Sequence, residues 1–187
     1  MRIISGNSKG KRILEPKDLN TRPLKDLTKE SIFNILAHSN KFSIRLQKSN
    51  VLDLFSGIGS FGLECLSRGS SNITFVENYN KVLPVLKKNI SNLNYQNNSV
   101  IIENDIINNL NFKAFVKKFD VIFIDPPYKE KCLLVILNHI IESDILNSNG
   151  IIIIHTHKKE EGKLPEKFNV IEKKTYGISK ILFGSYL

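Results

Sequence analysis

The feature that most constrains the fold is an alternation, from about residue 51 onward, of short apolar runs with longer segments of helical periodicity. The apolar runs have the length of buried strands, and they are Val51–Phe55, Ile73–Val76, Val100–Glu103, Val121–Asp125 and Ile151–His155. The segments between them are predicted as helices, namely Ser60–Arg68, Asn80–Leu93, Ile107–Lys118 and Cys132–Ile141. Apolar strands separated by helices indicate a mostly parallel sheet with both faces covered, and hence the α/β class.

The two ends of the chain follow a different pattern. The C-terminal tail predicts an antiparallel β-hairpin, with strands at Phe168–Thr175 and Ser179–Tyr186. At the other end, residues 1–26 form a short basic arm, and residues 27–39 predict a leading amphipathic helix with Thr28 as its N-cap. Because the length suits one domain and no low-complexity linker interrupts it, we expect residues 1–187 to form a single domain.

Positive charge is concentrated near the N-terminus. The chain has a formal net charge of +9, and residues 1–50 hold eleven Lys/Arg against four Asp/Glu. Because Lys and Arg displace counterions from phosphates, this distribution favours a nucleic-acid partner, although a solvated surface would also fit it. The candidate phosphate contacts in the arm are Lys9, Lys11 and Arg12.

Cysteine usage and hydropathy favour the cytosol. Cys65 and Cys132 are far apart and lie in no cluster of metal-binding residues, so neither a zinc site nor a disulfide framework is expected. No apolar leader follows Met1, and the longest aliphatic runs, Val121–Ile124 and Ile151–Ile154, are too short to span a membrane. We therefore expect a cytoplasmic protein without a membrane partner, and nothing in the sequence demands more than a monomer.

A glycine-rich loop follows the first predicted strand and opens a helix. Gly57, Gly59 and Gly62 fit the spacing GxGxxG, and Glu77 lies twenty residues after Gly57 at the end of the second strand. Glycines allow a tight turn and a close approach of the backbone to a ligand, and a carboxylate at Glu77 can accept both hydroxyls of a ribose. This pair alone fits nicotinamide, flavin and S-adenosylmethionine enzymes equally, and glycines that serve only helix packing remain the alternative.

Two acidic residues favour a cofactor that carries positive charge. Asp53 precedes the loop within the strand, and its carboxylate suits the ammonium and sulfonium groups of S-adenosylmethionine, whereas it would repel a pyrophosphate. Asp105 follows the third strand, where it can accept the adenine amino group or cap a helix that begins at Ile106. Phe55 and Asn78 complete the expected cofactor site together with Ile106.

The segment Asp125-Pro126-Pro127-Tyr128 ends the fourth strand, at the edge where open α/β sheets bind ligands. The Asp125 carboxylate and the Pro126 carbonyl can accept both N–H bonds of an exocyclic amino group, which frees the nitrogen lone pair for attack on a methyl group. Two consecutive prolines stiffen the loop, and Tyr128 can stack on a base. A turn that merely stops a strand would need neither the acid nor the aromatic residue.

Two histidines, His155 and His157, flank Thr156 just after the fifth predicted strand. We interpret them as strand-end residues, because their neighbours offer no third metal ligand. Transfer of a methyl group to an amino nitrogen needs neither a metal nor a strong general base, so no metal is expected.

Motifs that carry a family resemblance extend over nearly the whole chain. In the N-terminal part they are Arg2-Ile3-Ile4-Ser5-Gly6, Gly10-Lys11-Arg12-Ile13-Leu14, Thr21-Arg22-Pro23 and Lys29-Glu30-Ser31-Ile32-Phe33-Asn34. Further along they are Leu52-Asp53-Leu54-Phe55-Ser56-Gly57, Gly62-Leu63-Glu64, Leu66-Ser67-Arg68-Gly69, Val76-Glu77 and Asp125-Pro126-Pro127-Tyr128. In these motifs the chain resembles the bacterial 16S ribosomal RNA guanine-N2 methyltransferases of the RsmD type.

The resemblance implies a Rossmann-like class I methyltransferase fold with a seven-stranded sheet. It also implies S-adenosylmethionine as cofactor and N2 methylation of one guanine in small-subunit ribosomal RNA, within an assembling subunit. Cofactor roles fall on Asp53, Gly57, Gly59, Glu77 and Asp105. Catalytic roles fall on residues 125–128, and Arg22 is implied to contact RNA near the active site. The chain departs from the family at Leu24-Lys25, where Thr-Thr is common, and at Lys29, where many members carry Arg; both differences bear on how the RNA is held.

Other functions remain open at this stage. Related Asn/Asp-Pro-Pro-aromatic loops serve amino methyltransferases that act on adenine in DNA or on a protein glutamine, although the acid and the basic arm favour guanine in RNA. A nicotinamide-dependent reductase would explain the glycine loop and Glu77 but not Asp125-Pro126-Pro127-Tyr128. A non-catalytic RNA-binding assembly factor would have no need of that segment.

Overall fold

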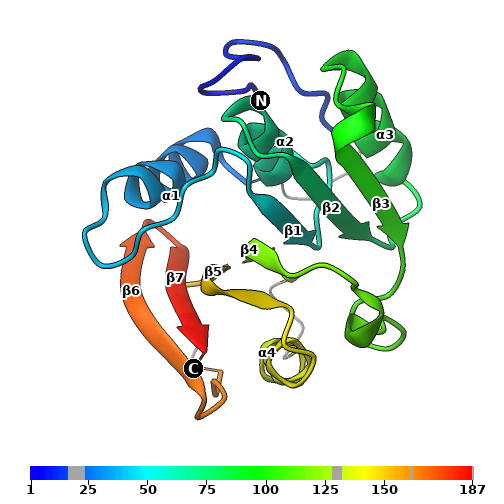
Figure 1. Cartoon of the computed structure of the whole chain (residues 1–187). Coiled ribbons are helices and arrows are strands. Elements are labelled where there is room, and N and C mark those ends of the chain that lie inside the picture. Colours follow the sequence, from blue (N-terminus) through cyan, green and yellow to red (C-terminus); the bar gives the residue numbers. More distant parts are fainter. Residues whose placement is uncertain (17–23, 128–131, 161, 187) are drawn as a thin grey trace.

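A computed structural model describes residues 1–16, 24–127, 132–160 and 162–186. Its centre is a seven-stranded sheet with the strand order β3-β2-β1-β4-β5-β7-β6 (Figure 1). The strands are β1 (Asn50–Leu54), β2 (Asn72–Glu77), β3 (Ser99–Glu103), β4 (Phe119–Ile124), β5 (Leu146–His157), β6 (Phe168–Tyr176) and β7 (Ser179–Tyr186). The first five pair in parallel, and β7 pairs antiparallel with β5 and β6. The predicted mostly parallel sheet with a terminal antiparallel hairpin is therefore confirmed.

The order of the strands reverses direction between β1 and β4. From β1 the chain moves outward through β2 to β3, and then returns to the other side of β1 with β4 and continues to β5. The register places Leu54 beside Ile124, so the segments after β1 and β4 leave the sheet at the same edge. Open α/β sheets bind ligands at such a switch point, which directs attention to these two segments.

Helices cover both faces of the sheet, and they are α1 (Asp26–His38), α2 (Ser60–Ser67), α3 (Leu83–Asn92) and α4 (Leu133–Glu142). The first three pack on one face and α4 packs on the other (Figure 1). Side chains alternate along each strand, so Val51 belongs to the first layer and Leu52 to the second. Because both faces are covered, the central strands read as continuous apolar runs. Within the described parts of the chain, no helix has the length and apolar character to cross a bilayer.

The predicted helix over Ile107–Lys118 is wrong. That segment contains only turns and the short 3₁₀ helix η2 (Phe112–Ala114); the other 3₁₀ helix of the described chain, η1, spans Gln96–Asn98. Asp105 accepts hydrogen bonds from two backbone amides in the first turn of the segment, and Asn111 accepts one from the amide two residues further on. Such side chains compete for the backbone donors that a helix needs, so apolar spacing alone did not produce one.

Two element boundaries also differ from the prediction. The N-cap of α1 is Lys25, so the assignment of Thr28 as N-cap is wrong, and Thr28 is buried within the first turns of the helix. Strand β5 begins at Leu146, ahead of the predicted start at Ile151. Leu146 pairs with Phe119 across a register shift, which extends the strand past the polar residues that seemed to precede it.

The N-terminal segment, residues 1–16, packs closely on the first helical layer. Ile3 and Ile13 are buried in the core, and the amide of Leu14 donates to Asn89 Oδ1 of α3 at 2.8 Å. A short antiparallel bridge between Arg2 and Arg12 closes the segment on itself. Its basic side chains therefore project from a backbone that is fixed to the fold.

A buried charge network holds this segment in place. Glu64 of α2 is fully buried, and its carboxylate accepts hydrogen bonds from the amides of Ile4 (2.8 Å) and Ser5 (2.9 Å) and from Arg68 Nε (2.8 Å). Lys29 of α1, also fully buried, lies 3.8 Å from Glu64. Burial lowers the pKa of Lys29, while Glu64 opposes that shift. Lys29 is thus part of the core, and its placement does not support the expectation that this position bears on how RNA is held.

Candidate active site

The glycine loop makes a tight turn between β1 and α2. Phe55, Gly57 and Gly59 all have positive φ, at 58°, 54° and 82°, a conformation that is strained for a side chain such as that of Phe55. A Cβ atom on Gly62 would lie 2.4 Å from Phe75 Cε1, so this glycine lets α2 approach β2 closely. Gly62 thus serves packing, while the turn at residues 55–59 brings backbone to the switch point.

Glu77 is fixed against this loop from the end of β2. One carboxylate oxygen accepts the amide of Gly57 at 2.8 Å, and the other accepts the amides of Asn78 and Tyr79, each at 2.9 Å. A carboxylate offers about four acceptor positions, so capacity remains for a further donor. The hydrogen bond between Gly57 and Glu77, twenty residues apart, places the predicted ribose acceptor beside the predicted loop. The backbone amide of Asn78 helps to fix the Glu77 carboxylate in this position.

Asp53 lies inside the protein, beneath the start of α2. Its carboxylate accepts the amide of Gly62 at 3.0 Å, and the residue is 1% exposed. Burial raises the pKa of Asp53 to about 8; the Gly62 hydrogen bond opposes the shift, and the negative charges of Asp125 and Glu77 add to it. Three carboxylates from β1, β2 and the end of β4 therefore act on one another at a single edge of the sheet.

Asp125, Pro126 and Pro127 follow β4 directly beside the glycine loop. The amide of Asp125 points to the carbonyl of Leu54 at 3.4 Å, which joins the two segments just before the loop begins. Asp125 lies on the same face of the sheet as Phe123 and is partly exposed, with a side chain that is 20% accessible. Tyr128, the fourth residue of the predicted motif, lies outside the described residues.

His155 is a site residue that the sequence reasoning missed. The parallel register pairs Ile124 with Ile154, so Asp125 and His155 are neighbours across β4 and β5. His155 Nδ1 lies 2.8 Å from Asp125 Oδ1, and His155 Nε2 lies 2.9 Å from Ser179 Oγ. His155 does lie in a strand, as interpreted, but its ring also contacts the residue on which the predicted chemistry depends.

Known proteins of similar sequence show the family to which the chain belongs. The family described as "Conserved hypothetical protein 95" matches residues 1–185. "Ribosomal RNA small subunit methyltransferase D" of Buchnera aphidicola subsp. Acyrthosiphon pisum is 33% identical, with 92% of this chain and 86% of the relative aligned. The Haemophilus influenzae protein of the same name is 31% identical, with 95% and 90% aligned. The chain belongs to the RsmD-type methyltransferase family.

Solved structures place this RsmD-type chain in the class I methyltransferase fold. The crystal structure of a provisionally assigned methylase of Haemophilus influenzae superposes with a TM-score of 0.77 at 28% identity, covering 100% of this chain and 98% of the other. A provisionally assigned methyltransferase of Escherichia coli gives a TM-score of 0.82 at 23% identity, covering 100% and 97%, which supports the fold alone. The predicted Rossmann-like methyltransferase fold is therefore confirmed.

In this family member, Asp105 sits in a turn after β3. Its carboxylate accepts the amides of Ile107 (2.9 Å) and Asn108 (3.1 Å) and the side-chain amide of Asn108 (3.0 Å). The Asn108 side chain and these backbone amides lower the pKa of Asp105. Of the two roles predicted for Asp105, capping is present, although of a turn and not of a helix. Ile106 beside it is buried, and contact of either residue with adenine remains a prediction.

Three of the four basic residues predicted to contact RNA lie on the N-terminal segment. Lys9, Lys11 and Arg12 are exposed on the N-terminal segment, and Arg22 lies outside the described residues. Their contact with RNA remains a prediction. In the described chain, no group of three His, Cys, Asp or Glu side chains is placed as metal ligands would be.

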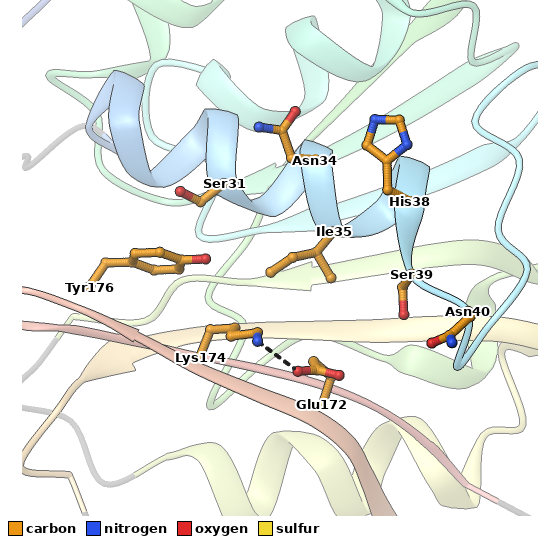
Figure 2. A pocket seen from close by; sticks show the side chains of 9 residues that line it. All are labelled: Ser31, Asn34, Ile35, His38, Ser39, Asn40, Glu172, Lys174 and Tyr176. Atoms are coloured by element: carbon orange, nitrogen blue, oxygen red, sulfur yellow. Dashed lines mark ion pairs between the residues drawn. The ribbon is translucent and has the colours of Figure 1, made fainter.

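A polar groove opens between α1 and β6, also away from the predicted site. Figure 2 shows Ser31, Asn34 and His38 of α1 on one side and Lys174 and Tyr176 of β6 on the other. Lys174 is paired with Glu172 across 3.2 Å, and Lys41 pairs with the same carboxylate. None of the described residues that the sequence predicts for the site lines this groove.

The raised pKa of Asp53 predicts a pH-dependent stability. Between pH 4 and pH 8 the folded protein binds more protons at Asp53 than the unfolded chain does, so this carboxyl destabilises the fold increasingly as pH rises through that window. Asp53→Asn keeps an acceptor for Gly62 without a charge. We expect the variant to gain stability relative to the parent, by up to about 1.4 kcal/mol per pH unit.

Urea unfolding without ligand at pH 5, 6, 7 and 8 would measure this gain, because other titrating groups cancel in the difference between the two proteins. A difference in unfolding free energy that stays constant with pH would contradict the assignment.

Proposed function

We propose that the protein uses S-adenosylmethionine to methylate the exocyclic N2 amino group of a guanine in small-subunit ribosomal RNA. The relatives named ribosomal RNA small subunit methyltransferase D support the RNA substrate. The observation that carries the proposal is the placement of Asp125 and Pro126 beside the glycine loop, at the switch point of the sheet. A cytoplasmic monomer acting on small subunits or their assembly intermediates fits this function.

The site suits a positively charged cofactor. Glu77 and Asp125 place negative charge at this edge, and that charge contributes to keeping the nearby Asp53 protonated; a cation is favoured there and the pyrophosphate of a dinucleotide is disfavoured. The hydroxyls of Ser56 and Ser60, on either side of the loop, are buried and have no hydrogen-bond partner within the described residues. Buried polar groups are normally satisfied, so these hydroxyls are available to a ligand held by the loop.

Specific residues would hold the cofactor. Glu77 has acceptor capacity for a ribose hydroxyl, and the turn at residues 55–59 presents backbone to the ligand. Asp105 would accept the adenine amino group, with Ile106 and Asn78 beside it. When bound, S-adenosylmethionine supplies an electrophilic methyl group on a sulfonium sulfur.

Asp125 and Pro126 activate the nucleophile in this proposal. The amino group of guanine is a poor nucleophile because its lone pair is delocalised into the ring. Asp125 Oδ2 and the Pro126 carbonyl would accept its two N–H bonds and favour a pyramidal nitrogen. Pro126 and Pro127 have fixed φ angles, so the acceptors are held in position before the substrate arrives. Tyr128 is proposed to stack on the extruded base.

The test is transfer of labelled methyl from S-adenosylmethionine to small subunits and to naked 16S RNA, followed by mass-spectrometric mapping of the modified nucleotide. We expect label in RNA at the N2 position of one guanine. Label on adenine, DNA or protein would favour another amino methyltransferase. Binding of RNA without any transfer would favour a non-catalytic assembly factor.

A further inference from the structure

We propose that His155 is a positioning residue that holds the Asp125 carboxylate ready for the substrate amino group, through a chain of hydrogen bonds from Ser179 to His155 to Asp125. This inference rests on the proposed function, because it gives Asp125 the acceptor role described above. The three residues come from β7, β5 and the end of β4, and they are brought together only by the pairing of those strands.

The geometry of the chain is continuous. Nδ1 of His155 lies 2.8 Å from Oδ1 of Asp125, and Nε2 lies 2.9 Å from Oγ of Ser179. The substrate end is the more exposed: the side chain of Asp125 is 20% accessible and that of His155 is 8% accessible, and Ser179 is also buried. Hydrogen bonds in such a position are poorly screened by water, so they fix the side chains more firmly than surface contacts would.

The directions of the bonds follow from the chemistry of the groups. An ionised carboxylate can only accept, so Nδ1 of His155 carries the proton and donates to Asp125 Oδ1. In the neutral ring Nε2 is then an acceptor, and Ser179 donates its hydroxyl proton to it. Asp125 thus selects the Nδ1–H form of the ring, and the Ser179 hydroxyl satisfies the remaining ring nitrogen.

The consequence for Asp125 concerns its orientation. Rotation of a carboxylate about its last torsion is broad, so an unsupported aspartate at a strand end would sample many orientations. With Oδ1 engaged by His155, the plane of the carboxylate is fixed and Oδ2 is left for the N–H of the base. Loss of this support should therefore slow the transfer step and leave binding of the cofactor and the RNA almost unchanged.

Kinetics of His155 variants test the role. We expect His155→Ala to lower kcat by about 10-fold to 100-fold, as the loss of a residue that orients a catalytic group typically does, with KM for both substrates within about 3-fold of the parent. His155→Asn retains a donor near the position of Nδ1 and should recover most of kcat. His157→Ala, on the same strand, is the matched control and should have parent kcat.

Three outcomes decide the question. Parent-like kcat in His155→Ala would overturn the inference, and so would an Asn variant that binds S-adenosylmethionine but is no more active than the Ala variant. If His155→Ala fails to fold, Ser179→Ala replaces it, with an expected drop in kcat of about 3-fold to 10-fold. An unchanged kcat in that variant would count against the chain of hydrogen bonds.

A measurement without turnover separates this inference from the proposed function. Long-range ¹H–¹⁵N NMR spectra of the parent protein report which ring nitrogen of His155 carries a proton, with His155→Asn used for assignment. A proton on Nδ1 supports the arrangement, and an Nδ1 without one overturns it, whatever the protein methylates. A parent protein that shows the Nδ1–H form but transfers no methyl to RNA would refute the proposed function alone.

Discussion

Asp125→Ala should lower the rate of methyl transfer to RNA by at least about 100-fold, comparable to the loss of a preorganised group that stabilises a transition state. The substitution removes an acceptor for the substrate amino group and leaves the Pro126 carbonyl as the remaining one. Binding of S-adenosylmethionine should change little, because Glu77 and the loop at residues 55–59 stay in place. Initial rates with labelled cofactor and calorimetry of cofactor binding would measure the two effects separately.

Two further variants sharpen this experiment. Asp125→Asn keeps one oxygen acceptor, but its amide group must face either His155 or the base, so its rate should lie between those of the parent and the Ala variant. Glu103→Ala removes an exposed carboxylate at the end of β3, on the same edge of the sheet, and should leave the rate unchanged. If Asp125→Ala transferred methyl as fast as the parent, the mechanism proposed for the amino group would be wrong.

Glu64→Ala should destabilise the fold by about 3–5 kcal/mol, the range observed when one partner of a buried charged pair is removed. The amides of Ile4 and Ser5 would lose their acceptor, and the buried Lys29 would keep only the partly exposed Asp26, at 3.6 Å, as a nearby counter-charge. The N-terminal segment would then be held to α2 only through its hydrogen bonds with Ser67 and its apolar contacts. Urea unfolding monitored by circular dichroism would give the free energy of unfolding.

Matched variants identify the cause of that loss. Removing Lys29 as well, in Glu64→Leu with Lys29→Met, should recover part of the stability, because no buried charge is then left unpaired. Glu103→Ala breaks an exposed ion pair with Lys87 and should cost less than about 1 kcal/mol. A cost for Glu64→Ala as small as that of Glu103→Ala would mean that the network does not stabilise the fold.

The strands could be read from the sequence because the fold covers both faces of the sheet. Val51–Phe55 and Val121–Asp125 are apolar except for one aspartate each, so their assignment needed no knowledge of their neighbours. The apolar spacing of Ile107–Lys118 is that of a helix, but the prediction was wrong because the side chains of Asp105 and Asn111 accept hydrogen bonds from nearby backbone amides. A pattern of hydrophobic residues gives little information on which polar side chains will compete with a helix for backbone amides.

The candidate site likewise contains residues whose proximity the sequence predicts and residues whose contacts it does not predict. The glycine loop, Glu77 and the Asp125 segment each follow a strand, and the carboxyl ends of parallel strands meet at one edge, so their proximity could be predicted. His155 ends the predicted fifth strand and lies at the same edge, but its contact with Asp125 depends on the register of β4 and β5, which the sequence does not specify. The burial of Lys29 and Glu64 was not predicted either, since charged residues on helices are usually exposed.

The central position of β1 and β4 links activity to the integrity of the whole sheet. Each of these strands has a neighbour on both sides, so its backbone amides are protected from hydrogen exchange until adjacent strands separate. The loops that carry Gly57 and Asp125 are anchored in this most protected part of the molecule. We therefore expect fraying at the outer strands β3 and β6 to leave Gly57 and Asp125 in register, and inactivation by heat to coincide with global unfolding.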